Sequence, residues 1–267
     1  MGKAIALACR QYGKSAAMKA AGTVGDSPLF LFTYVLRLLR VVVLLTLWRS
    51  LLPAHGSTSG LTLHQVLTYT ILGEAVEPLL VCRTWLEDAF WSGAIATRYL
   101  RPMGIFGQFT AEMFGPIALG LAFFSLPLLA LAPLLGVDPF PASLGAGLLF
   151  LISLALAVTV SLAIEYIFSG FAVAIQMHPY AINSLRAAVW AVLSGAFLPL
   201  ALLPWGLGRV FEWLPFAATA STPLKIYIGS GAVAPMLALQ ALWAALLWPI
   251  AIWLWRRNRE RMVAYGG

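Results

Sequence analysis

The sequence predicts an all-α membrane protein, and three observations lead to this fold class. Hydrophobic residues make up 61% of the chain and charged residues 10%, whereas a soluble domain of this size carries roughly a quarter charged residues. The mean hydropathy is +0.88. Long apolar runs recur along the chain without the alternation typical of a transmembrane barrel. We therefore expect a single transmembrane domain over residues 1–267, with no separate soluble domain.

The apolar runs predict six transmembrane helices joined by short loops, because an α-helix needs about 20 apolar residues to cross a bilayer. The expected spans cover about residues 29–52, 61–82, 109–135, 144–168, 185–203 and 235–255.

Residues 1–28 precede the first span and predict a helix on the membrane surface. Ile5, Cys9, Tyr12 and Ala16 recur on one face, and the basic residues lie elsewhere, as in interfacial helices. The stretch lacks the compact apolar core and cleavage site of a signal peptide.

The distribution of lysine and arginine predicts that both termini are cytoplasmic. Of the 17 basic residues, twelve would lie on the inner side and only Arg209 and Lys225 on the outer side. The other three, Arg37, Arg40 and Arg49, fall within the first span. Because basic loops stay inside, this asymmetry sets the orientation and places residues 83–102 in the cytoplasm.

Residues 83–102, RTWLEDAFWSGAIATRYLRP, form a polar segment between two apolar runs. Trp85, Leu86 and Phe90 recur at near-helical spacing, which predicts a short amphipathic helix that ends at Ser92-Gly93. Two interpretations stay open from the pattern alone: an ordinary loop, or a docking helix for a soluble partner.

Charged residues inside the first two spans predict two ion pairs. In two antiparallel helices, the residue numbers of two residues at equal depth add up to the same total at every depth. This rule matches Arg37 with Glu77 and Arg40 with Glu74. A lone charge in a bilayer is costly, so pairing is expected. The pairs would serve as a structural clamp, or in substrate passage or transmission of a partner's motion.

Residues 204–234 are rich in proline and glycine and predict an extracytoplasmic segment. Trp205 and Trp213 suit a helix in the outer interface; the alternative is a re-entrant cap over a translocation path.

No catalytic, cofactor-binding or metal site is expected. Cys9 and Cys82 are isolated from each other and from the three histidines, so the spacing needed for a metal site is absent. Glu112 and Glu165 lie near the cytoplasmic ends of their spans, where we expect them to reach headgroup water.

Two motifs carry a resemblance that covers nearly the whole chain. WLEDAFWSGAIATRYLRP and GAFLPLALLPWGLGRVFEWLPFAATASTPLKIYIG resemble segments of the permease of bacterial ABC type-2 exporters. The first motif rests on Trp85, Gly93, Leu100, Arg101 and Pro102, and the second on Gly195, Pro199, Pro204, Leu214, Pro215, Phe216, Pro223 and Gly229.

This resemblance implies a transport subunit of the bacterial inner membrane, surrounded by lipid, that is not itself an enzyme and binds no nucleic acid. A separate cytoplasmic ATP-binding subunit would bind ATP, so the chain itself needs no cofactor. Consistent with this, the chain has no GxxxxGK[ST] phosphate-binding loop. A second permease chain would complete the substrate path, more often as a heterodimer. Residues 83–102 would be the coupling helix, docking on the ATPase through Trp85, Leu86, Glu87, Asp88, Phe90, Gly93 and Arg101.

Two other function classes remain as alternatives. An intramembrane enzyme would need a catalytic constellation inside the spans, such as paired aspartates, and a secondary transporter often shows inverted repeats. Neither feature is evident in the sequence.

Overall fold

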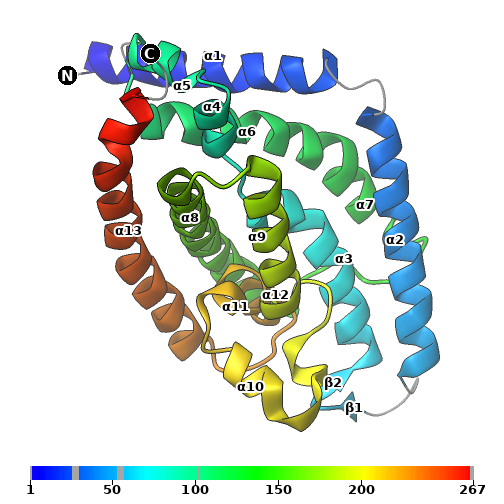
Figure 1. Cartoon of the computed structure of the whole chain (residues 1–267). Coiled ribbons are helices and arrows are strands. Elements are labelled where there is room, and N and C mark those ends of the chain that lie inside the picture. The colour runs from blue at the N-terminus through cyan, green and yellow to red at the C-terminus, as the bar shows by residue number, and fades with distance from the viewer. Residues whose placement is uncertain (1, 26–29, 53–56, 102, 265–267) are drawn as a thin grey trace.

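The computed structural model describes residues 2–25, 30–52, 57–101 and 103–264, and most of them are helical. Long helices run side by side from one end of the molecule to the other, with α2 and α13 on opposite sides (Figure 1). Helix α1 lies across the end of this bundle, at the same end as the C-terminus (Figure 1).

The first part of the chain forms the helix α1 Gly2–Gly25, which lies across the end of the bundle, and two helices of the bundle, α2 Phe30–Leu51 and α3 Leu63–Leu80. A two-stranded hairpin, β1 Ser57–Thr58 and β2 Leu61–Thr62, precedes α3. Thr62 caps α3 by accepting a hydrogen bond from the backbone of Gln65, whose side chain accepts one in return. This reciprocal cap satisfies backbone donors that would otherwise be exposed at the helix start.

The middle of the chain holds two short helices followed by a long, nearly continuous one. These are α4 Leu86–Trp91, α5 Ile95–Tyr99 and α6 Ile105–Gly120, which continues through a π-helical turn, η1 Leu121–Ser125, into α7 Leu126–Leu131. The remaining elements are α8 Leu144–Ile175, α9 Pro179–Leu193, η2 Leu200–Leu202, η3 Pro204–Gly206, α10 Leu207–Phe211, α11 Pro215–Thr219, α12 Ser221–Tyr227 and α13 Val233–Ala264.

Among the described residues, four helices are long and apolar enough to cross a membrane: Leu31–Leu51, Ile105–Leu131, Leu144–Ile175 and Val233–Asn258. The expected spans 61–82 and 185–203 are not among them. Helix α3 carries Glu74 and Glu77 within its 18 residues, and α9 has only 15. An all-α membrane protein is thus evident, while the number of six spans stays a prediction.

Residues 204–234 form an exposed part and a buried part, and their place relative to the membrane stays a prediction. Trp205 and Trp213 are strongly exposed, as an interfacial helix requires. Helices α11 and α12, in contrast, are mostly buried and pack against α8. Gln240 of α13 donates a hydrogen bond of 2.7 Å to the carbonyl of Ala218, which ties α11 into the bundle. The segment therefore turns back among the long helices after its exposed tryptophans.

Helix α1 packs along α6, and a glycine permits the close approach. A Cβ atom at Gly115 of α6 would clash with the carbonyl of Ala16 in α1. Tyr12 lies on the same face and sits against Gly107 of α6. The apolar face expected from Tyr12 and Ala16 is thus turned toward the bundle. Cys9 and Ile5 fall outside the described side chains.

Candidate partner-docking segment and buried ion pairs

The polar segment after α3 folds as two short helices at the end of the bundle where α1 lies (Figure 1). Helix α4 starts after Trp85, whose backbone has a left-handed conformation with φ 55°. Gly93 has φ 73° and separates α4 from α5. Because this conformation strains residues that carry a Cβ atom, glycine is favoured at the turn, where the sequence predicted a break.

Three of the residues expected on the docking surface are buried inside the chain instead. The side chains of Leu86 and Phe90 belong to a hydrophobic cluster with residues of α6, α8 and α13. Glu87 is only 2% exposed. This burial argues against the docking roles expected for Leu86, Glu87 and Phe90. The face that they define is turned toward the bundle, where burying Leu86 and Phe90 removes apolar surface from water.

Glu87 connects the segment to two other helices. Its carboxylate accepts a hydrogen bond of 2.7 Å from Ser169 of α8 and another of 2.6 Å from the amide of Asn183 in α9. Asn183 also accepts a hydrogen bond from Arg186, at 3.5 Å. The acidic side chain is thus fully engaged within the chain, which is how a buried charge is usually accommodated.

Glu165 lies at the centre of the same network, against the expectation that it reaches headgroup water. It is 1% exposed and forms an ion pair of 2.8 Å with Arg186. Its other oxygen accepts hydrogen bonds from the backbone and hydroxyl of Thr84, at 2.6 and 3.0 Å. Arg186 also donates to the carbonyl of Cys82. The start of the segment is therefore bound to both α8 and α9.

Glu112 is also buried, and it binds the other end of the segment. It pairs with Arg98 at 2.5 Å and with Arg101 at 3.4 Å. Gln108 of the same helix, α6, donates to the carbonyls of Arg98 and Met103. The expectation of a water-exposed Glu112 is corrected, because two arginines of the segment compensate its charge.

The sequence reasoning missed Ser169, Asn183 and Arg186 as partners of the segment. Arg186 was counted only as a basic residue of an inner loop. The signal that could have identified it is Glu165, a second isolated charge at the expected inner end of a neighbouring span, because such charges are rarely left without a partner.

The surface that the segment leaves open to a partner consists of other residues. Trp91 and Leu100 are exposed large apolar side chains, and Trp91 packs edge-on against His178, with 5.1 Å between ring centroids. Asp88 is partly exposed and pairs with Arg83 at 3.0 Å. The remaining candidate docking residues, Trp85, Gly93 and Arg101, are half-buried or exposed.

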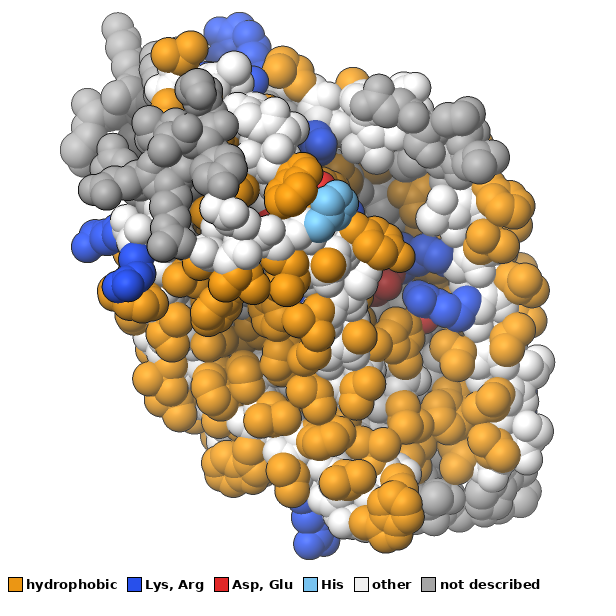
Figure 2. Space-filling view, viewed as in Figure 1, with side chains coloured by type: hydrophobic (Ala, Val, Ile, Leu, Met, Phe, Trp, Pro, Cys, Tyr) orange, Lys and Arg blue, Asp and Glu red, His pale blue; other side chains and the backbone are white. Residues whose placement is uncertain are grey.

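The charged residues of α2 and α3 are paired as the antiparallel register of the two helices predicts. Arg37 binds Glu77, and Arg40 binds Glu74; Arg40 also lies 3.7 Å from Glu77. The guanidinium of Arg37 stacks over Phe124, 4.2 Å from the ring centroid. Figure 2 shows acidic and basic side chains together in a hollow between α2 and α3, surrounded by hydrophobic side chains.

These features define a multi-pass helical membrane protein whose polar segment and buried charges lie among apolar helices. The sequence model of the family described as ABC-2 family transporter protein matches residues 38–266. The chain therefore belongs to this family, the membrane component of ABC transporters, and its role is transport rather than catalysis. No curated protein matches the sequence significantly.

Proposed function

We propose that the chain is a permease subunit of an ABC exporter and that an ATP-binding subunit on a separate chain drives it. In this proposal it has six spans, including α3 and α9, with both termini in the cytoplasm of a bacterial inner membrane. A second, related permease chain completes the substrate path. The membership in the transporter family and the basic asymmetry support this arrangement.

One observation carries the proposed mechanism. Residues 83–101 have an exposed tip, formed by Trp91 and Leu100, and a buried base that is bound to three helices of the bundle, α6, α8 and α9. Glu87 and Thr84 connect the segment to α8 and α9, and Arg98 connects it to α6. A force applied to the tip is transmitted through these contacts, because buried, hydrogen-bonded groups resist separation. The segment is therefore the element that passes the movement of the ATPase to the spans.

The docking contact itself involves Trp91, Asp88 and Leu100 rather than Glu87. Exposed aromatic side chains are frequent anchors of protein interfaces. Asp88 supplies a negative charge beside Trp91, on the same short helix. Because the burial of Glu87 excludes it from the contact, replacing it would disturb the fold and would not test docking.

The test is the double variant Asp88→Arg with Trp91→Ala, made in a tagged chain that is purified from its own host membranes. We expect the ATPase activity that copurifies with the tag to fall at least about tenfold, which corresponds to about 1.4 kcal/mol of lost interface energy. The yield of the permease should stay unchanged, because Trp91 is exposed and Asp88 is partly exposed.

Trp205→Ala is the matched control, since this tryptophan is also exposed but lies in the segment after α9. It should leave the copurified ATPase activity unchanged. An unchanged activity in the double variant would contradict the docking role and return the segment to an ordinary loop.

A further inference from the structure

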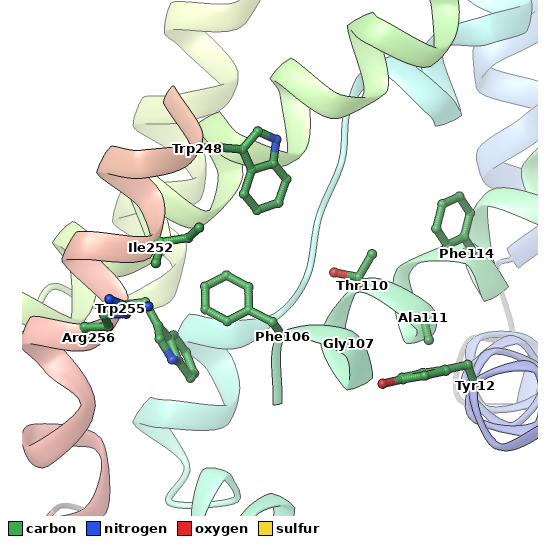
Figure 3. A pocket seen from close by; sticks show the side chains of 10 residues that line it. All are labelled: Tyr12, Phe106, Gly107, Thr110, Ala111, Phe114, Trp248, Ile252, Trp255 and Arg256. Atoms are coloured by element: carbon green, nitrogen blue, oxygen red, sulfur yellow. The ribbon is translucent and has the colours of Figure 1, made fainter. Parts of the chain in front are cut away.

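A groove at the corner of α1, α6 and α13 has no role in the proposed mechanism. Its volume is about 720 Å³, within the usual range of ligand pockets. Figure 3 shows Phe106, Thr110 and Phe114 on α6 facing the groove, with aromatic side chains of α13 on one side and Tyr12 of α1 on the other. The complete lining is Tyr12, Phe106, Gly107, Thr110, Ala111, Phe114, Trp248, Ile252, Trp255 and Arg256.

The lining is almost entirely apolar and is held in place by ring contacts. Phe106 packs against Trp255 with 4.6 Å between centroids, and against Tyr166 with 4.3 Å. The hydroxyl of Thr110 lies 2.8 Å from that of Tyr166, so this polar group of the lining already has a hydrogen-bond partner. Phe114 and Ile252 remain exposed at the rim. A groove of this kind accepts a hydrocarbon chain and offers little to a polar ligand.

Arg256 gives the groove a charged end. It lies in the last turns of the apolar part of α13, which ends at Asn258, and it lines a second cavity of about 430 Å³ that shares Phe106 and Trp255 with the first. Among the residues that the structure describes, no acidic side chain lines either cavity and none forms an ion pair with Arg256. The junction of the two cavities therefore carries a positive charge without a described counter-ion.

We propose that this groove binds an anionic phospholipid. Its acyl chain lies among Phe106, Trp248 and Trp255, and its phosphate meets Arg256. The combination of an apolar groove between apolar helices and an arginine at its end matches the two parts of such a lipid, since basic pockets between transmembrane helices bind lipid headgroups. We expect the basic C-terminal end of the chain on the cytoplasmic side, where the inner leaflet supplies anionic lipids.

The bound lipid has a structural consequence for α1. Tyr12 is the residue of α1 that lines the groove, so an acyl chain there fills the space between α1 and α13. Because α1 contacts the bundle mainly along α6, the lipid supplies its link to α13. This inference rests on the membrane location of the chain and on the proposed cytoplasmic side of its C-terminal end, and not on the docking of an ATPase.

The experiment uses tryptophan fluorescence and brominated lipids, because bromine on an acyl chain quenches a neighbouring indole. The full-length protein is reconstituted in phosphatidylcholine vesicles that contain an equal small fraction of either brominated phosphatidylglycerol or brominated phosphatidylcholine. The quenching that arises in the groove is the difference between the quenching of the unchanged protein and that of the Trp248→Phe, Trp255→Phe double variant. This difference should be larger with the anionic lipid, with a relative affinity about fivefold higher, as one arginine near a charged headgroup provides.

Arg256→Gln should abolish this preference, and Arg257→Gln should keep it. The two arginines are adjacent and exposed, but Arg257 lies over Trp253 and does not line the groove.

Three results would overturn the proposal. Equal quenching by the two lipids would indicate a groove for neutral lipid, and no quenching lost in the double variant would indicate that no acyl chain occupies it. An equal loss of preference in Arg256→Gln and Arg257→Gln would indicate a diffuse basic surface rather than a site. Because the readout involves no ATPase, a failure here leaves the proposed function standing.

Discussion

Two groups of charged residues lie among the apolar helices, and they are built differently. Around Glu165 and Arg186, which are 1% and 11% exposed, the contacts join α8 and α9 to each other and to the polar segment. Around Glu77 and Arg40, which are 22% and 37% exposed, the ion pairs join only α2 and α3. The Nε atoms of Arg37 and Arg40 have no hydrogen-bond partner among the described residues.

This difference indicates different tasks for the two groups. The buried network holds a surface segment to the long helices, and it has little freedom to rearrange because its donors and acceptors are already engaged. The α2–α3 pairs open onto a hollow in the molecular surface (Figure 2), although the Nε atoms of Arg37 and Arg40 are themselves buried. Because Arg40 and Glu77 are partly exposed, water can reach these pairs, and the loss of one of them should cost less than the loss of a pair in the buried network.

The largest effect is expected from Arg186→Met, which leaves Glu165 buried without its cation. Removal of one partner of a buried pair costs about 3–5 kcal/mol. The purified variant should therefore unfold at a lower temperature and accumulate at a lower level in the membrane, which fluorescence-detected thermal unfolding in detergent measures.

Adding Glu165→Gln to Arg186→Met should recover part of this loss, because an uncharged amide is less costly to bury than a lone carboxylate. A double variant that is less stable than the single one by the full additive amount would show that the two side chains do not act as a pair.

The broad fold was predictable because it depends on composition. Runs such as 144–168 are apolar enough to identify a span without tertiary information, and helix α8 extends from Leu144 to Ile175. Helices α3 and α9 are harder to assign, because α3 carries two glutamates and α9 is short. Whether such helices cross a membrane depends on what surrounds them, which hydropathy does not record.

The ion pairs of α2 and α3 were predictable because a short turn sets the register of two antiparallel helices. The direction in which the polar segment faces could not be predicted from the sequence. An acidic-apolar pattern fits a helix facing a partner as well as a helix facing its own bundle. Only the positions of Ser169 and Asn183, some 80 to 100 residues later in the chain, decide that Glu87 points inward.

A smaller effect is expected from Glu77→Ala in the partly exposed pair. The loss should be about 2 kcal/mol, below the 2.5–3.5 kcal/mol of a lone charge at the centre of a membrane helix, because Arg37 keeps a hydrogen bond to the carbonyl of Glu74. The same thermal unfolding assay measures this loss. Arg37→Ala together with Glu77→Ala should be more stable than the sum of the two single losses predicts; strict additivity would argue against pairing.

The smallest effect is expected from the Arg83–Asp88 pair, which belongs to the polar segment but lies at its surface. Both side chains are more than 40% exposed, and exposed pairs contribute about 0.2–1 kcal/mol. Arg83→Gln should therefore leave the unfolding temperature nearly unchanged, in contrast to Arg186→Met in the buried network. Arg83 also lies near the ring of Trp85, 5.5 Å from its centroid, so any small loss has two sources. Asp88→Asn separates them, because it removes the ion pair and leaves the ring contact. If either variant destabilised the protein as much as Arg186→Met does, the surface of the segment would be as constrained as its buried base, and the distinction between an open tip and a fixed base would fail.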